Sequence, residues 1–193
     1  MHERVEQTHK TWNQWIRQAM ELVSTHQSPD FATKVSKTLW RALIADTTHV
    51  NKEGLAPPCY ERYFQLYKEV YIDDIRYHDL DFKQVDALVA NDLRVSDEAR
   101  SQASQYHFSF LDASIGRRLC ITERGNLGLV PSEVAKGDRV CVLLGAKAPF
   151  VVRETPKTVR GQRKYELVGD CYIDGLMVGE GLMMGNIQEI TLE

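Results

Sequence analysis

Glycine is distributed unevenly along this chain of 193 residues, and the distribution limits what each half can fold into. Gly54 is the one glycine before residue 116, whereas the other eleven lie between Gly116 and Gly185. Glycine adopts the positive φ angles that tight turns require, and it weakens helices. The distribution therefore predicts helices in the first half of the chain and strands joined by tight turns in the second.

Apolar side chains in the first half recur at the three- and four-residue steps of amphipathic helices. Helix-start signals precede several of these segments: Pro29 follows Ser28, Asp81 precedes Phe82, and two acids follow Ser96. We expect helices over residues 5–23, 29–43, 60–71, 82–89 and 97–110.

The second half consists of short apolar runs separated by glycine turns, which is the pattern of strands. We expect strands over residues 119–122, 127–130, 140–144, 150–152, 165–173 and 187–192. Together the halves predict an α+β fold. In this fold a helical layer, residues 1–115, packs on a small antiparallel β-barrel or rolled sheet, residues 116–193, as one continuous structural unit.

Composition excludes several classes of protein. With 43% hydrophobic and 26% charged residues the chain is neither disordered nor fibrous. No apolar run approaches the roughly 18–20 residues that span a bilayer, and the first residues lack the apolar core of a signal peptide. A net charge of −3 and four scattered cysteines argue against nucleic-acid binding, disulfides and zinc. We expect a cytoplasmic protein without metal or cofactor, and without a nucleic-acid or membrane partner.

His107 is the histidine best placed for chemistry. It lies on the apolar face of the last expected helix, three residues before Phe110 and next to Tyr106. A partly buried imidazole beside a phenol can act as an acid–base pair near neutral pH. The alternative is a core histidine held by one hydrogen bond, which is the commoner case.

A second group of candidates lies near the end of the chain. Asp170, Tyr172 and Asp174 alternate along the expected strand and would share one face, and Glu180 follows two glycine turns later. Carboxylates beside a tyrosine can supply a general base and its matching acid. A solvated face with a salt bridge to an arginine such as Arg117 explains the same pattern.

Four segments follow one another in the second half of the chain: Arg117–Pro131, Gly137–Gly145, Pro149–Arg153 and Tyr165–Glu180. They resemble consecutive blocks of fungal heterokaryon-incompatibility (HET) proteins. The resemblance begins upstream with the helical segment Leu39–Asp46 and the turn at Ala56–Tyr60, and covers most of residues 30–192. It implies the C-terminal region of a HET protein without the N-terminal effector domain, so the activity of that domain is not implied.

Two classes of function remain open. In the first, the chain is a cofactor-free isomerase, epimerase or cyclase that moves protons on a small molecule of fungal secondary metabolism. His107, Asp170 or Asp174 would be the base, and Tyr106 or Tyr172 the proton donor. In the second, it is a non-catalytic binding or regulatory module of the heterokaryon-incompatibility response. Homo-oligomerisation is open in both. We favour the enzyme, because the sequence supplies acid–base residues.

Overall fold

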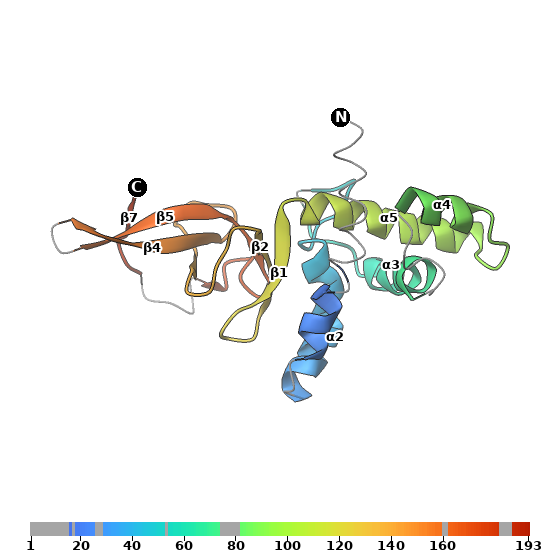
Figure 1. Ribbon diagram of the computed structural model, residues 1–193, viewed down its shortest axis with the longest axis horizontal. Helices are drawn as coiled ribbons and strands as arrows, with labels where there is room; N and C mark the ends of the chain where they lie inside the picture. The colour runs from blue at the N-terminus through green and yellow to red at the C-terminus, as the bar shows by residue number, and fades with distance from the viewer. Residues whose placement is uncertain are drawn as a thin grey trace. The chain divides into compact units, whose positions relative to one another are not determined.

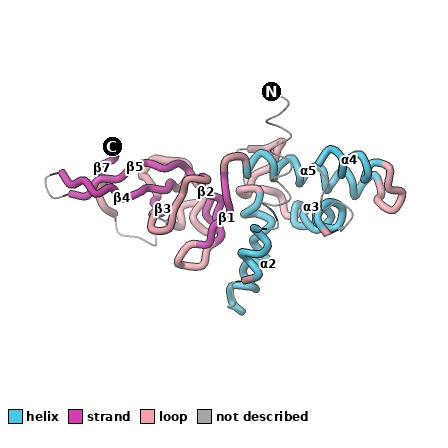
Figure 2. Tube along the Cα trace, viewed as in Figure 1, coloured by secondary structure: helices cyan, strands magenta, loops and turns pink. Residues whose placement is uncertain are grey.

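The computed structural model describes residues 16, 18–25, 29–52, 54–73, 82–159, 162–181 and 187–193. The chain divides into two compact units, Met1–Ala113 and Ser114–Glu193. Helices α2 to α5 run up to Ser114, and the strands begin at Arg117 (Figures 1 and 2). The predicted α+β class is therefore confirmed, whereas a single continuous structure of both halves stays a prediction.

The first unit is built from the predicted amphipathic helices. They are α2 (Pro29–Leu43), α3 (Cys59–Tyr67), α4 (Phe82–Ala90) and α5 (Asp97–Ser114), and residues 18–24 are also helical. The start of the first expected helix, before residue 16, and the expected cap Asp81 lie outside the described residues. None of the helices in the described ranges combines the length and the apolar character needed to cross a membrane.

The expected helix over 60–71 is wrong in its second part. Residues Lys68–Ile72 form a π-helical turn, η1, in which the N–H of Asp73 donates to the carbonyl of Lys68 at 2.8 Å. This wider i→i+5 turn still buries Val70 and Tyr71. Apolar spacing over five residues does not distinguish a π-helical turn from an α-helical one.

Helix α5 supplies the centre of the helical unit. Tyr106, His107 and Phe110 are fully buried on its inner face. The rings of Phe64 and Tyr67 on α3 lie 5.2 and 5.4 Å from the ring of Tyr106. These tilted contacts add to the burial of apolar area, so an aromatic cluster holds α3 against α5.

Helix α2 ends in a Schellman-type turn that lacks the usual glycine. The N–H of Asp46 donates to the carbonyl of Arg41 at 2.8 Å, and the N–H of Ala45 donates to the carbonyl of Ala42 at 3.2 Å. Ala45 therefore adopts a left-handed φ of 51°. A Cβ in this conformation clashes with the following carbonyl oxygen, so the turn carries backbone strain.

Replacing Ala45 by glycine is expected to raise the free energy of unfolding by about 1 kcal/mol, because glycine adopts this φ without the clash. Urea denaturation of both proteins measures the change. The control is Ala87→Gly in the exposed interior of α4, which should lower stability by roughly 0.5–1 kcal/mol. A loss of stability in both variants would contradict the interpretation of the α2 turn.

The second unit contains two open sheets. One has β1 (Arg117–Ile121), β2 (Leu127–Pro131) and β6 (Tyr172–Ile173); the other has β3 (Arg139–Cys141), β4 (Phe150–Val159), β5 (Gln162–Asp170) and β7 (Thr191–Leu192). All pairings are antiparallel except that of β5 with β7, which is parallel. The described strands therefore form a rolled pair of sheets and do not close into a barrel.

The chain passes from one sheet to the other at Cys171. The expected single strand over 165–173 is wrong, because β5 ends at Asp170 in one sheet and β6 begins at Tyr172 in the other. At the junction the Cys171 N–H donates to the carbonyl of Pro149 at 2.9 Å. Arg117 donates to both the carbonyl and the carboxylate of Asp170, at 3.0 and 2.6 Å.

One small core joins the two sheets. It contains Val130 from β2, Val151 from β4, Ile173 from β6, and Cys171 from between β5 and β6, each at most 2% exposed. Partly buried residues complete it at its edges. They are Cys120, Val134, Val168 and Leu176.

The segment between β2 and β3 is held by a buried carboxylate. The guanidinium of Arg153 donates to both oxygens of Asp138, at 2.9 and 2.7 Å, and the N–H of Ala135 donates to the same group at 2.8 Å. Arg153 also donates to the carbonyl of Glu133. The hydrogen bonds from Arg153 keep the pKa of Asp138 below its ordinary value, although burial acts in the opposite direction.

The β4–β5 hairpin is long and irregular (Figure 1). β3 pairs with β4 only from Phe150 to Val152. Beyond that point the register of β4 against β5 shifts between Glu154 and Thr158, around Pro156. The outer edge of this part of β4 is therefore neither covered by β3 nor regular.

Gly128 on β2 is required by close packing between strands. A Cβ at this position would lie 2.7 Å from the carbonyl oxygen of Tyr172 and 3.3 Å from the sulfur of Cys120. The carbonyl belongs to the paired strand β6, so it cannot move without disturbing the ladder.

Gly128→Ala is therefore expected to lower the free energy of unfolding by about 1–3 kcal/mol through overpacking. Chemical denaturation followed by circular dichroism measures the loss. Lys136→Ala, an exposed substitution in the same unit, should change stability by less than about 0.5 kcal/mol. If Gly128→Ala is as stable as the Lys136→Ala control, the close approach of β2 and β6 is wrong.

Candidate functional site

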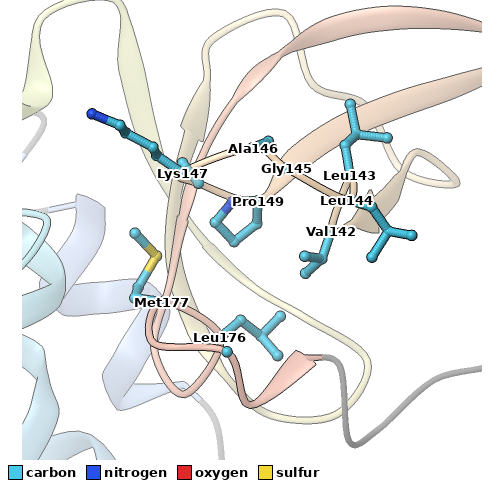
Figure 3. A pocket seen from close by; sticks show the side chains of 11 residues that line it. Val142, Leu143, Leu144, Gly145, Ala146, Lys147, Pro149, Leu176 and Met177 are labelled. Atoms are coloured by element: carbon cyan, nitrogen blue, oxygen red, sulfur yellow. The ribbon is translucent and has the colours of Figure 1, made fainter.

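A pocket of about 130 Å³ lies in the second unit between two loops (Figure 3). The first loop connects β3 to β4 and the second follows β6. The side chains of the lining are apolar apart from one lysine, and polar atoms of the two loops also contribute to its surface. The lining consists of Val142, Leu143, Leu144, Gly145, Ala146, Lys147, Ala148, Pro149, Leu176, Met177 and Gly179.

Glycines at positive φ shape both loops. Gly145 (φ 87°) turns the first loop, where the N–H of Ala146 donates to the carbonyl of Leu143 at 3.0 Å. Gly179 (φ 94°) turns the second. A carboxylate oxygen of Glu180 accepts the N–H of Val178 at 2.8 Å and closes that turn. Residues with a Cβ rarely adopt these angles, so the loops depend on glycine at both positions.

The pocket is open to solvent and its rim is apolar. Leu144 in its lining is 69% exposed, and Val178, beside the lining residue Met177, is 70% exposed. Lys147 is the one charged side chain of the lining. The arrangement can bury an apolar group and offer one cation to it, but its lining contains no histidine, carboxylate or tyrosine that could transfer a proton.

The structure places Tyr106 and His107 in the core of the helical unit. The hydroxyl of Tyr106 donates to the carbonyl of Trp40 at 2.8 Å, and burial raises the pKa of this hydroxyl well above its ordinary value. The His107 ring lies 5.9 Å from that of Tyr71, nearly parallel to it, and its Nδ1 is 3.4 Å from the hydroxyl of Tyr67. The core alternative described for His107 therefore agrees with its position.

The four other candidates lie in the strand unit but do not share one face. Asp170 is exposed and paired with Arg117, whereas Tyr172 is 3% exposed in β6. Asp174 follows β6, and its N–H donates to the carbonyl of Leu127. Glu180 binds the N–H of Val178. The expected alternation is wrong because the chain changes sheets at Cys171.

The thiols of the strand unit are unreactive by environment. Burial raises the pKa of Cys120 to about 11 and that of Cys171 to about 12. Burial also raises the pKa of Cys141. Thiolates are the reactive form, so the raised pKa values keep these cysteines in the less reactive thiol form. Among the described residues no group of three histidine, cysteine or acidic side chains is arranged to hold a metal ion.

The sequence did contain a signal for the pocket. The run 140–144 was expected to be a buried strand, but β3 ends at Cys141 and the apolar residues continue into a loop. Gly145 closes that run, and Gly175 and Gly179 flank Leu176 and Met177. Apolar residues bracketed by glycines in two loops predict exposed apolar turns, which is an alternative to buried strands.

The sequence matches a known class of domain. The model of the Het-6 beta-barrel domain matches residues 24–189, which is most of the chain. The chain therefore belongs to the Het-6 beta-barrel domain family, and the predicted relationship to HET proteins is confirmed. No solved structure matches the chain.

A relative of known name comes from Neurospora crassa. The chain is 43% identical over 65 residues to heterokaryon incompatibility protein 6, OR allele. This match covers 34% of the chain and 9% of the relative, so the matched segment is a small part of both proteins.

Tyr106→Phe tests whether the phenol is structural. Removing the hydroxyl leaves the buried Trp40 carbonyl without its donor, which should lower the free energy of unfolding by about 1–3 kcal/mol. Urea denaturation measures the change. Tyr60→Phe is the matched control, since Tyr60 belongs to the same aromatic cluster and no hydrogen bond of its hydroxyl to another described residue is present. Equal stabilities of the two variants would contradict this role.

Proposed function

We propose that the chain is a non-catalytic recognition module of the heterokaryon-incompatibility response, which binds an apolar side chain of a partner protein in the pocket beside Leu144 and Met177. The observation that carries the proposal is an apolar pocket with an exposed apolar rim in the strand unit. Apolar side chains that gather on an exposed surface are typical of interaction sites. Membership of the Het-6 family and the incompatibility protein from Neurospora crassa support the biological setting.

The size of the pocket favours a side chain over a small-molecule substrate. Pockets for cofactors and drug-sized ligands occupy about 300–1,000 Å³, whereas this pocket has about 130 Å³. A cavity of about 150 Å³ holds a benzene molecule. The pocket is therefore suited to one side chain of leucine, isoleucine, methionine or phenylalanine, which is how anchor residues bind at interfaces.

The isomerase, epimerase or cyclase hypothesis receives less support from the geometry. Tyr106 and His107 are engaged inside the helical unit, and Asp170 is held by Arg117. None of the six candidate residues lines the pocket. Proton transfer requires a base and an acid that converge on one substrate, and the pocket offers neither.

The binding proposal predicts that a leucine side chain enters the pocket. Burying it contributes roughly 1.5–3 kcal/mol, so a short peptide should bind weakly, with a dissociation constant above about 1 mM. The probe is acetyl-Gly-Gly-Leu-Gly-Gly-amide, and the readout is the NMR signal of the ¹³C-labelled methyl group of Met177, assigned with Met177→Leu. We expect a saturable shift that the pentaglycine peptide does not produce.

Leu144→Asp should abolish this shift, because it places a charge on the apolar rim. Leu93→Asp is the control, since Leu93 is also an exposed leucine but lies in the helical unit. A Met177 signal that is insensitive to the leucine peptide, or that responds equally to pentaglycine, would overturn the proposal. Deuterium uptake into a compound of a fungal metabolite extract incubated with the protein in D₂O would favour the isomerase instead.

A further inference from the structure

Lys147 is the residue of the pocket lining that can distinguish partners by their charge. It is exposed and lies in the loop between β3 and β4, and it is the one charged residue of the lining. Its ammonium nitrogen lies at the free end of a side chain that extends away from Val142 and Leu144 (Figure 3). The ammonium therefore lies outside the apolar lining, on the solvent side of the loop, and not inside the pocket.

Four carboxylates of the strand unit have other partners than Lys147. Asp138 binds Arg153, and Asp170 binds Arg117. Glu154 pairs with both Arg139 and Arg163. The carboxylate of Glu180, next to the lining residue Gly179, accepts the N–H of Val178. No ion pair of Lys147 is present among the described residues, so its charge is available to a carboxylate from outside.

The net charge of residues 114–193 is positive, like that of Lys147. Residues 114–193 contain 11 lysines and arginines and 10 acids, whereas the whole chain contains 24 and 27. The strand unit is thus slightly positive within a chain that is negative overall. Complementary charge at an interface directs which partner binds and speeds association.

From these observations we infer that the partner segment is acidic: it carries an aliphatic anchor residue that fills the pocket and, within two residues of it, an aspartate or glutamate that pairs with Lys147. The inference rests on the proposed function, because it names the chemistry of the partner of the same pocket. The anchor supplies apolar burial, and the carboxylate supplies the preference among partners, since an exposed ion pair adds little affinity.

The test compares peptides that differ only in charge. The probes are acetyl-Glu-Gly-Leu-Gly-Glu-amide and acetyl-Lys-Gly-Leu-Gly-Lys-amide, titrated against the full chain and followed by the Met177 methyl signal. The acidic peptide should bind about two- to fivefold more tightly than the neutral leucine peptide, and the basic one more weakly. Raising the salt concentration should remove the difference, because salt screens exposed charges.

The variant Lys147→Glu should reverse the order in which the acidic and basic peptides bind. Lys136→Glu is the matched control, an exposed lysine of the same unit outside the pocket lining, and it should keep the original order. Circular dichroism shows that both variants fold.

Each remaining outcome decides between the two proposals. If the three leucine peptides bind equally, or if Lys136→Glu reverses the order as well as Lys147→Glu, the acidic partner is wrong and the binding pocket stands. If no leucine peptide moves the Met177 signal, both proposals are wrong. If acetyl-Glu-Gly-Gly-Gly-Glu-amide binds as tightly as the leucine version, Lys147 binds anions without the pocket, and the combined recognition is overturned.

Discussion

The strand unit depends on the point at Cys171 where the chain passes from one sheet to the other. Asp170 is the last residue in the four-stranded sheet and Tyr172 the first in the three-stranded sheet, so a single residue links the two sheets around a core of only a few side chains. The Cys171 N–H bonds the carbonyl of Pro149, directly before β4, and Arg117 at the start of β1 holds Asp170. The first loop of the pocket ends at Pro149, which accepts the Cys171 N–H, and the second loop follows β6. Both loops are therefore attached to the part of the chain that passes between the sheets.

The helices could be predicted from the sequence because their period is local. A stripe of apolar residues specifies which face of a helix is buried, and α2, α4 and α5 follow it. The π-helical turn after Tyr67 could not be predicted, since it shifts the register by one residue within a run that is aromatic on several sides. The left-handed conformation of Ala45 could not be predicted either, because hydrogen bonds impose it and alanine does not favour it.

The strands show the limit of the same reasoning. Alternation along Asp170, Tyr172 and Asp174 is compatible with one strand or with two, because alternation does not show which strand each residue pairs with. Likewise Val142 and Leu144 have the composition of a buried strand but lie in a loop beyond β3. For the candidate site, the burial of His107 could be predicted from its helix face. What the sequence did not distinguish was a packed imidazole from a reactive one.

The uncovered edge of β4 has a consequence for how this domain can meet other proteins. An open strand edge normally invites a strand of another chain to extend the sheet, which leads to filaments and aggregates. Here Pro156 lacks an N–H, and the shifted register around it interrupts the row of donors and acceptors. A strand added from another chain would find an incomplete ladder. The register shift and Pro156 thereby make this part of β4 a poor template for sheet extension by another chain.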